Sequence, residues 1–174
     1  LFFAIFADSF VRASSLSTVL YAASTIGIMA VPVALLMIGG EFDLSAGVMV
    51  TTSALISSMF SYQMTANVWV GVLVSLLVTL AIGVFNGVML TRTDPPSFII
   101  TLGTFLMLTG INLGFTKLIS GTVSTKSISD MEGFSSAKDV FASTLTIGGV
   151  DFKITILWWL VLVAVATWIL LRTR

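Results

Sequence analysis

Residues 39–47 hold the side chains of this sequence that are best suited to chemistry. They read Gly-Gly-Glu-Phe-Asp-Leu-Ser-Ala-Gly and place two carboxylates, Glu41 and Asp43, beside long apolar runs. Ionisable groups next to a bilayer are costly unless they face water, a cavity or a partner. One interpretation is a re-entrant or broken-helix element that lines a pathway. The other, which we favour and which is compatible with the first, is a solvated loop in which Asp43 or Ser45 caps the next helix.

Hydroxyl side chains are frequent in the apolar run that follows this segment. They are Ser45, Thr51, Thr52, Ser53, Ser57, Ser58 and Ser61. Such side chains could line a polar translocation path, for which Ser53 and Ser57 are the candidates. They could equally bond back to carbonyls of their own helix. The sequence leaves both interpretations open.

Two short motifs place an asparagine between glycines that are four residues apart. They are Gly83, Asn86 and Gly87 in one, and Gly110, Asn112 and Gly114 in the other. Small residues at this spacing let membrane helices approach closely, and an asparagine can hydrogen-bond across the contact. We therefore favour helix packing for both motifs. The alternative is that Asn86 or Asn112 contacts a transported molecule.

Enzymatic chemistry has no support in the sequence. The chain has no histidine and no cysteine, and it lacks the HExxH, GxSxG and Walker A motifs. We expect no catalytic residue, no metal site and no cofactor. The net charge of zero gives no basic surface for nucleic acid. The apolar runs also lack the central carboxylates or histidines that a proton-driven carrier needs, which indicates an energy source outside the subunit.

The composition is that of an integral membrane protein. Hydrophobic residues make up 57% of the chain and charged residues 9%, against about 25% charged residues in soluble domains. A helix needs about 20 apolar residues to cross a bilayer. The sequence predicts an all-α polytopic transmembrane helix bundle in one domain, residues 1–174. Five full spans are expected at 16–38, 46–62, 68–90, 98–118 and 154–171, after a partial span at 1–6, with a kink or break at Pro32.

Residues 119–153 are predicted to form an aqueous loop between the last two spans, with a short surface helix at about 135–142. Alternate loops lie on opposite sides of the membrane. One side holds Arg92, Arg172 and Arg174, and the other holds Arg12, Lys126 and Lys138, with Lys117 and Lys153 at span ends. By count alone, the positive-inside rule slightly favours the second side as cytoplasmic.

Three segments together resemble one family. Residues 39–47 resemble the GG-x-(x)-DLS-x-G signature of ribose-type bacterial ABC sugar permeases. Asn86-Gly87 followed by residues 95–104, Pro-Pro-Ser-Phe-Ile-Ile-Thr-Leu-Gly-Thr, is similar to that family's NG…PPFIxTLGT segment, apart from the extra Ser97. Residues 170–174 are similar to the start of its large cytoplasmic loop. The order and spacing of the three segments also fit, so the resemblance covers nearly the whole chain.

The resemblance implies a permease subunit of an ATP-driven importer for a monosaccharide or similar sugar, in the bacterial plasma (inner) membrane. Its implied partners are a cytoplasmic ATP-binding subunit, an extracytoplasmic sugar-binding protein and a second permease, as a homodimer or pseudo-dimer in the lipid bilayer. Arg172 and Arg174 would begin the loop that contacts the ATPase. The chain would be the N-terminal half, truncated at both ends and unable to transport alone.

The family orientation places Arg92 and Arg172 in the cytoplasm and 119–153 outside, and we follow it over the charge count, which rests on a long loop and truncated ends. A secondary carrier or channel half that needs no ATPase is the alternative function.

Overall fold

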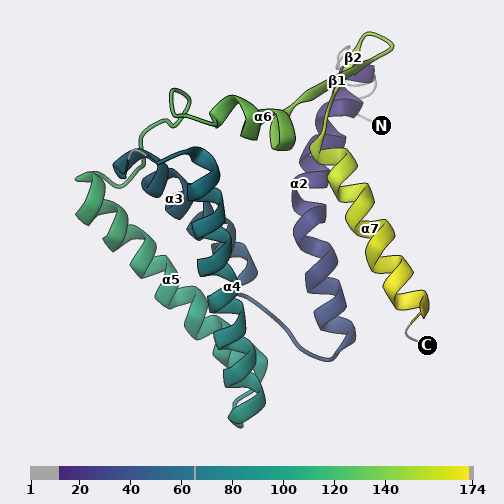
Figure 1. Ribbon diagram of the computed structural model, residues 1–174. Helices are drawn as coiled ribbons and strands as arrows, with labels where there is room; N and C mark the ends of the chain where they lie inside the picture. Colours follow the sequence, from purple (N-terminus) through teal and green to yellow (C-terminus); the bar gives the residue numbers. More distant parts are fainter. Residues whose placement is uncertain (1–11, 65, 173–174) are drawn as a thin grey trace, which may run out of the picture. The chain divides into compact units, whose positions relative to one another are not determined.

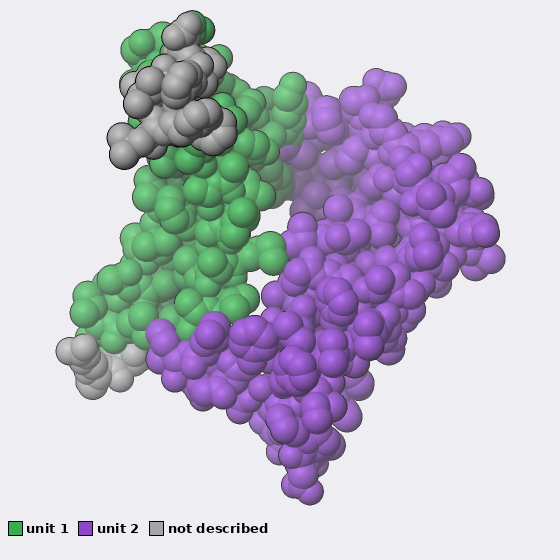
Figure 2. All heavy atoms as spheres, turned by 180° about the vertical axis from the view of Figure 1, so that it is seen from behind, with its two compact units in different colours: residues 1–35, 138–174 green, residues 36–137 purple. Residues whose placement is uncertain are grey.

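The computed structural model describes residues 12–64 and 66–172. The predicted partial span at 1–6 lies outside these residues. The described chain is mainly helical and separates into two compact units, residues 1–35 with 138–174 and residues 36–137 (Figure 2). We describe each unit by itself.

Over residues 12–64 and 66–172, five long helices and one short helix account for most of the structure (Figure 1). The long helices are α2 (Ala13–Ile38), α3 (Ala46–Gln63), α4 (Val68–Arg92), α5 (Ser97–Ser120) and α7 (Thr155–Arg172), and the short one is α6 (Phe134–Ala142). Each long helix falls within three residues of a predicted span at either end. The short helix confirms the one predicted near 135–142. The all-α polytopic prediction is therefore confirmed.

Four of the described helices, α2, α4, α5 and α7, are long and apolar enough to cross a membrane. The remaining predicted span, 46–62, corresponds to α3, which has 18 residues but carries six serines and threonines that lower its apolar character. It packs chiefly against α4 and also against α5. Helix α2 continues through Pro32 as a single element, so the proline does not divide this span.

The helix ends in unit 36–137 follow local rules. Asn67 caps α4, its side-chain oxygen accepting the backbone N–H of Trp69 at 3.0 Å. Pro95 and Pro96 separate α4 from α5, because proline cannot continue the preceding helix. Helix α5 ends at Gly121, whose φ of +72° is a left-handed conformation that glycine adopts without strain.

The polarity of the interior is reversed relative to a soluble protein. Among the described residues, buried apolar side chains are few, while buried polar ones are Ser17, Ser24, Ser45, Thr52, Ser61, Ser75, Asn86, Thr101, Thr104 and Thr116. Large apolar side chains such as Leu76, Leu80 and Leu118 are exposed. Lipid supplies no water for hydrogen bonds, so polar groups gather between helices and apolar ones face outwards.

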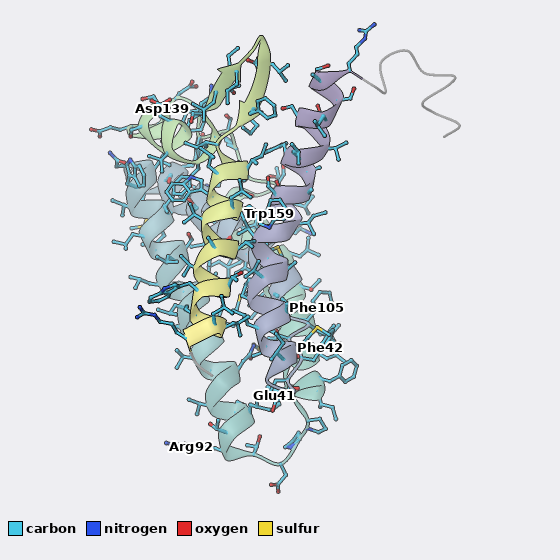
Figure 3. All side chains as sticks on the ribbon, turned by 90° about the vertical axis from the view of Figure 1, so that its right-hand side faces the viewer. Glu41, Phe42, Arg92, Phe105, Asp139 and Trp159 are labelled. Carbon is cyan, nitrogen blue, oxygen red and sulfur yellow. The ribbon has the colours of Figure 1, made fainter. Side chains whose placement is uncertain are left out.

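Unit 1–35 with 138–174 pairs two spans and a small sheet. Helices α2 and α7 run side by side in the same direction (Figure 1). The indole of Trp159, labelled in Figure 3, lies so close to Gly27 that a β-carbon there would be 2.3 Å from its nitrogen. Before α7, strands β1 (Thr144–Ile147) and β2 (Val150–Lys153) form an antiparallel hairpin, which the sequence interpretation had treated only as loop.

Candidate functional site

The segment between α2 and α3 begins with a tight turn that ends α2. Gly40 has a φ of +86°, which side-chain-bearing residues rarely adopt. Its N–H donates to the carbonyl of Met37 at 3.0 Å, and the N–H of Glu41 donates to that of Leu36 at 3.1 Å. These bonds satisfy carbonyls of the last helical turn. The predicted interruption at 39–45 is thus a non-helical segment with its own ordered backbone.

Hydroxyl groups at the start of α5 hold this segment in place. The N–H of Phe42 donates to Ser97 Oγ at 3.1 Å, and the N–H of Leu44 donates to Thr101 Oγ1 at 3.2 Å. The Thr101 hydroxyl in turn donates to the carbonyl of Ser97 at 2.8 Å, with the carbonyl of Phe42 at 3.3 Å. Exposed peptide groups are not tolerated inside a bilayer. The α5 hydroxyls supply the partners that this irregular backbone needs.

Asp43 stabilises the beginning of α3. One of its carboxylate oxygens, Oδ1, accepts the backbone N–H of Ser45 at 2.7 Å and the Ser45 hydroxyl at 2.6 Å. Ser45 occupies the N-cap position, but its own side chain makes no capping bond. Hydrogen bonds to an ionised carboxylate are shorter and stronger than neutral ones. Of the two residues proposed as caps, Asp43 is therefore the one whose side chain orders the helix start.

A buried chain of hydrogen bonds continues from Ser45 into both neighbouring helices. Asn86 of α4 donates from Nδ2 to Ser45 Oγ at 3.1 Å, and Thr104 of α5 donates to Asn86 Oδ1 at 2.6 Å. Ser45 is fully buried, and Asn86 and Thr104 are 7% and 3% exposed. We call Asp43, Ser45, Asn86 and Thr104 the Asn86 network. It joins the starts of α3 and α5 to the second half of α4.

A small pocket of about 130 Å³ adjoins the network. Its polar lining comes from Glu41, Asp43, Asn86, Ser97 and Thr101, and apolar residues complete the wall. Figure 3 shows Glu41 and Phe42 towards the end of unit 36–137 where Arg92 lies. The volume suffices for several water molecules. The pocket therefore offers Glu41 and Asp43 the polar surroundings that carboxylates beside apolar spans require.

A larger groove of about 520 Å³ runs between α3 and α5. Its lining is mainly apolar, with polar groups from Thr51, Thr109, Asn112 and Thr116. Asn112 donates to Thr52 Oγ1 at 2.9 Å across the two helices. Spaced hydroxyl and amide groups in an apolar wall are what recognition of a small polar molecule requires.

The serines predicted to line a path do not line this groove. Ser53 donates back to the carbonyl of Val50 at 2.9 Å, as the self-bonding interpretation allowed. Ser57 lies on the α4 side of α3, because a β-carbon on Gly71 would be 2.5 Å from its carbonyl oxygen. A role of Ser53 or Ser57 in translocation stays a prediction.

The two asparagines and their flanking glycines behave differently in the described structure. Asn86 and Asn112 both hydrogen-bond between helices, as a packing role requires. A β-carbon at any of the four flanking glycines would meet no atom within 4 Å. Close approach of another helix at Gly83, Gly87, Gly110 and Gly114 stays a prediction.

Of the remaining candidates, Arg172 is the last residue of α7. The guanidinium of Arg172 lies 4.7 Å from the centre of the Trp168 ring, a cation–π distance. Arg174 is outside the described residues. Within the described part of the chain, no group of three or more acidic side chains could hold a metal ion.

Apart from Asn112, the sequence interpretation missed the polar side chains of α5 that bond to other elements, although a signal for them was present. Small or polar residues recur on this helix at Ser97, Thr101, Thr104, Asn112 and Thr116. Spacings of three and four residues place side chains on one face of a helix. A hydroxyl stripe on an otherwise apolar span marks a buried, partner-facing surface.

Comparison with known proteins supports a transport role. The autoinducer 2 import system permease protein LsrD of Klebsiella pneumoniae is 30% identical over 131 residues, which are 75% of this chain and 38% of the relative. The xylose transport system permease protein XylH of Haemophilus influenzae is 31% identical over 134 residues, 70% of this chain and 34% of the relative. The galactose/methyl galactoside import permease protein MglC of Salmonella typhimurium is 28% identical over 179 residues, which cover 95% of this chain and 51% of the relative.

The chain thus spans from about a third to half of the length of these curated relatives. No solved structure matches it. Residues 15–174 match the family described as branched-chain amino acid transport system / permease component. Together with the apolar helices, this match shows a multi-pass membrane protein. The chain belongs to that family of transport permeases, and the curated proteins to which it is similar are named for the import of xylose, galactose or methyl galactoside, and autoinducer 2.

Proposed function

We propose that this chain is the N-terminal part of the membrane-spanning permease of an ATP-driven importer for a monosaccharide or a similarly hydroxylated small molecule. The relatives supply the transport class. The observation that carries the proposal for this chain is the Asn86 network. It brings together the segments on which the resemblance to sugar permeases rests, 39–47, Asn86-Gly87 and 95–104, in one buried cluster.

The network gives the proposed permease a fixed framework at one membrane surface. The non-helical segment before α3 is bonded to α5 through Ser97 and Thr101, and the start of α3 is bonded to α4 through Ser45 and Asn86. Movement of any one of these helices therefore acts on the other two. In our proposal this end faces the cytoplasm and moves as a unit when a separate ATP-binding subunit closes, with Arg172 at the start of the coupling segment.

The groove between α3 and α5 is the proposed lining of the translocation path. The polar residues of this lining are Thr51, Thr109, Asn112 and the buried Thr116. The Thr109 hydroxyl donates to the carbonyl of Phe105 at 2.7 Å and can still accept a bond. The Asn112 amide uses one N–H on Thr52 and keeps a second donor and its carbonyl acceptor for a sugar hydroxyl. Neither an acidic nor a basic side chain belongs to this lining, so the groove suits an uncharged substrate. A second permease subunit would close its open side, and an extracytoplasmic binding protein would deliver the sugar.

The test uses the full-length permease together with its ATP-binding and sugar-binding subunits. These are expressed in a host that lacks its own uptake systems for xylose and galactose, and uptake of both labelled sugars is measured. We expect uptake of at least one sugar, and its loss when the ATP-binding subunit carries a Walker-motif substitution. The same host with labelled leucine provides the matched amino-acid control.

Each other outcome identifies a different function. Uptake that survives the Walker substitution but stops with a protonophore would show a secondary carrier. Uptake of leucine instead of either sugar would retain the importer class and reject the sugar. Absence of any ATP-dependent uptake, with all subunits assembled, would reject the importer proposal for these substrates.

A further inference from the structure

The hairpin β1–β2 has one apolar face and one polar face. Strand residues alternate between faces, and paired residues share a face. Leu145 pairs with Phe152, and Ile147 pairs with Val150, so these four apolar side chains lie together. On the other face, the Thr146 hydroxyl donates to Asp151 Oδ1 at 2.6 Å, and Lys153 Nζ donates to Thr144 Oγ1 at 2.8 Å.

The apolar face is not used to form a core within the described chain. Ile147 is 65% exposed and Leu145 is 41% exposed, while Val150 and Phe152 are partly exposed. An isolated two-stranded hairpin is only marginally stable in water and normally packs against another surface. A partner for this face is therefore required by the physics of the hairpin itself.

The base of the hairpin is fixed to the first turn of the span α7. The N–H of Ile154 donates to the carbonyl of Ser143 at 3.0 Å. The last turn of α6, which directly precedes the hairpin, is also bonded to α7. The indole N–H of Trp158 donates to the carbonyl of Val140 at 2.9 Å, and the Thr155 hydroxyl lies 3.3 Å from the carbonyl of Phe141. Lys153, the last strand residue, precedes the first residue of α7 by only two positions. The hairpin cannot move far from the membrane surface at which α7 begins.

The neighbouring span reaches the same level. Near the N-terminal end of α2, the Ser17 hydroxyl donates to the carbonyl of Asp151 in β2. Trp158 and Trp159 lie in the first turns of α7. Tryptophan is enriched where hydrocarbon meets lipid headgroups. The hairpin is thus bonded to two span ends, at the depth where an amphipathic element can place its faces in different media.

We propose that the hairpin is a membrane-surface anchor. It lies in the headgroup layer with Leu145, Ile147, Val150 and Phe152 on the acyl chains and with Thr144, Thr146, Asp151 and Lys153 towards water. This is the β-sheet counterpart of an interfacial amphipathic helix, which buries its apolar face at the same boundary. The partner is the lipid surface, because the hairpin leads directly into α7, an apolar span in which no residue is buried within the described structure.

The charges of the hairpin agree with this placement. Asp151 and Lys153, its two charged side chains, both lie on the polar face and both bond to threonines across the strands. Neither has to be buried when the opposite face enters lipid. The turn between the strands consists of Gly148 and Gly149, with φ of +60° and +80°. This matches the two-residue turns that keep hairpins tight and their faces uniform.

The test measures the depth of single cysteines in the full-length permease. The protein is made cysteine-free, one cysteine is introduced, a nitroxide is attached, and the protein is studied in lipid nanodiscs without any binding protein. Ile147→Cys is compared with its neighbour Thr146→Cys, and Val150→Cys with Asp151→Cys. The two strands give independent pairs, so one variant that fails to assemble does not leave the question open.

We expect alternation along both strands. The ratio of accessibility to oxygen over accessibility to a water-soluble nickel chelate should be several-fold higher at 147 and 150 than at 146 and 151, because apolar oxygen concentrates in the acyl chains and the charged or polar chelate stays in water. Equal accessibility of both faces to nickel overturns the anchor. Protection of the apolar face only after the binding protein is added also overturns it and assigns that face to protein docking.

A second measurement separates this inference from the proposed function. Ile147→Asp should move the label at 150 into water, whereas Thr146→Asp, on the polar face, should not move it. Both readings depend on the insertion of α7 in the membrane and not on the molecule transported. The anchor therefore survives if no sugar uptake is found, and it fails on the depth pattern alone.

Discussion

The bond between Thr104 and Asn86 should couple α5 to α4 energetically. Asn86→Leu keeps a side chain of similar size but removes the acceptor of the 2.6 Å bond from Thr104 and the donor of the 3.1 Å bond to Ser45. Hydrogen bonds between membrane helices contribute about 0.6 kcal/mol on average and about 1.7 kcal/mol at most. For two bonds we expect a loss of about 1–3 kcal/mol in the free energy of unfolding.

The partners of Asn86 moderate this loss. Without Asn86, the Thr104 hydroxyl retains the carbonyl of Ile100 at 3.3 Å as an acceptor. The Ser45 hydroxyl still donates to Asp43. No donor is therefore left buried without an acceptor, and the penalty for an unsatisfied group does not apply in full. We therefore expect a loss of unfolding free energy in the lower half of the range of about 1–3 kcal/mol.

The assay is a double-mutant cycle on the full-length protein in mixed micelles, in which unfolding is followed during titration with a denaturing detergent. The variants are Asn86→Leu, Thr104→Val and the double variant. Because the two residues share one short buried bond, we expect a coupling free energy of about 1 kcal/mol. Thr91→Val is the matched control, since the exposed Thr91 hydroxyl bonds only to carbonyls of its own helix, and its effect should stay within about 0.5 kcal/mol.

Additive effects of Asn86→Leu and Thr104→Val would refute the reasoning. They would mean that the two side chains do not share a bond in the folded protein. A loss of unfolding free energy at Thr91→Val as large as that at Thr104→Val would also refute the reasoning. It would show that any threonine hydroxyl on these helices contributes equally to stability, whether or not it bonds to another helix.

Two further predictions concern close packing and the helix start. Gly71→Ala should destabilise the protein by about 1–3 kcal/mol in the same unfolding assay, because its β-carbon would lie 2.5 Å from the carbonyl oxygen of Ser57. No loss of stability at Gly71→Ala would contradict the α3–α4 contact. Gly83→Ala meets no atom within 4 Å in the described structure, so a comparable loss there would show that another helix packs against Gly83. Asp43→Ala should lower ATP-dependent uptake and reduce the free energy of unfolding by about 0.5–2 kcal/mol, as the loss of a helix cap does. Asp43→Asn keeps an acceptor for the N–H of Ser45 and should retain most of the uptake and most of the stability. Equal uptake by wild type and Asp43→Ala at equal expression would remove Asp43 from any essential role.

The spans could be predicted from the sequence because a transmembrane helix satisfies its own backbone. Helices α4 and α5 begin and end within two residues of the predicted runs at 68–90 and 98–118. Asn67 and the proline pair provide local start and stop signals for them. Such features depend only on residues near in sequence.

The hairpin before α7 was missed, although a local signal for it exists. Alternating Thr-Leu-Thr-Ile and Val-Asp-Phe-Lys flank the Gly148-Gly149 pair, and such a pair between alternating residues is typical of a two-residue turn. The prediction for residues 119–153 was an aqueous loop with one short helix and no strand. The paired strands and the bond from Ser17 to Asp151 show why the segment is ordered.

The multi-pass membrane character, the approximate bounds of the long helices, and a helix start at Asp43 and Ser45 could all be predicted from residues close in sequence. Which polar side chains meet became visible only once the helices were packed. In the Asn86 network, Asn86 bonds to Ser45, which lies 41 positions earlier, and to Thr104, which lies 18 positions later. The groove is lined by Thr51 rather than by Ser53 or Ser57. The physical reason is that a helix fixes its own backbone locally, whereas a buried side chain finds its partner only when helices pack, and that packing depends on every contact between them.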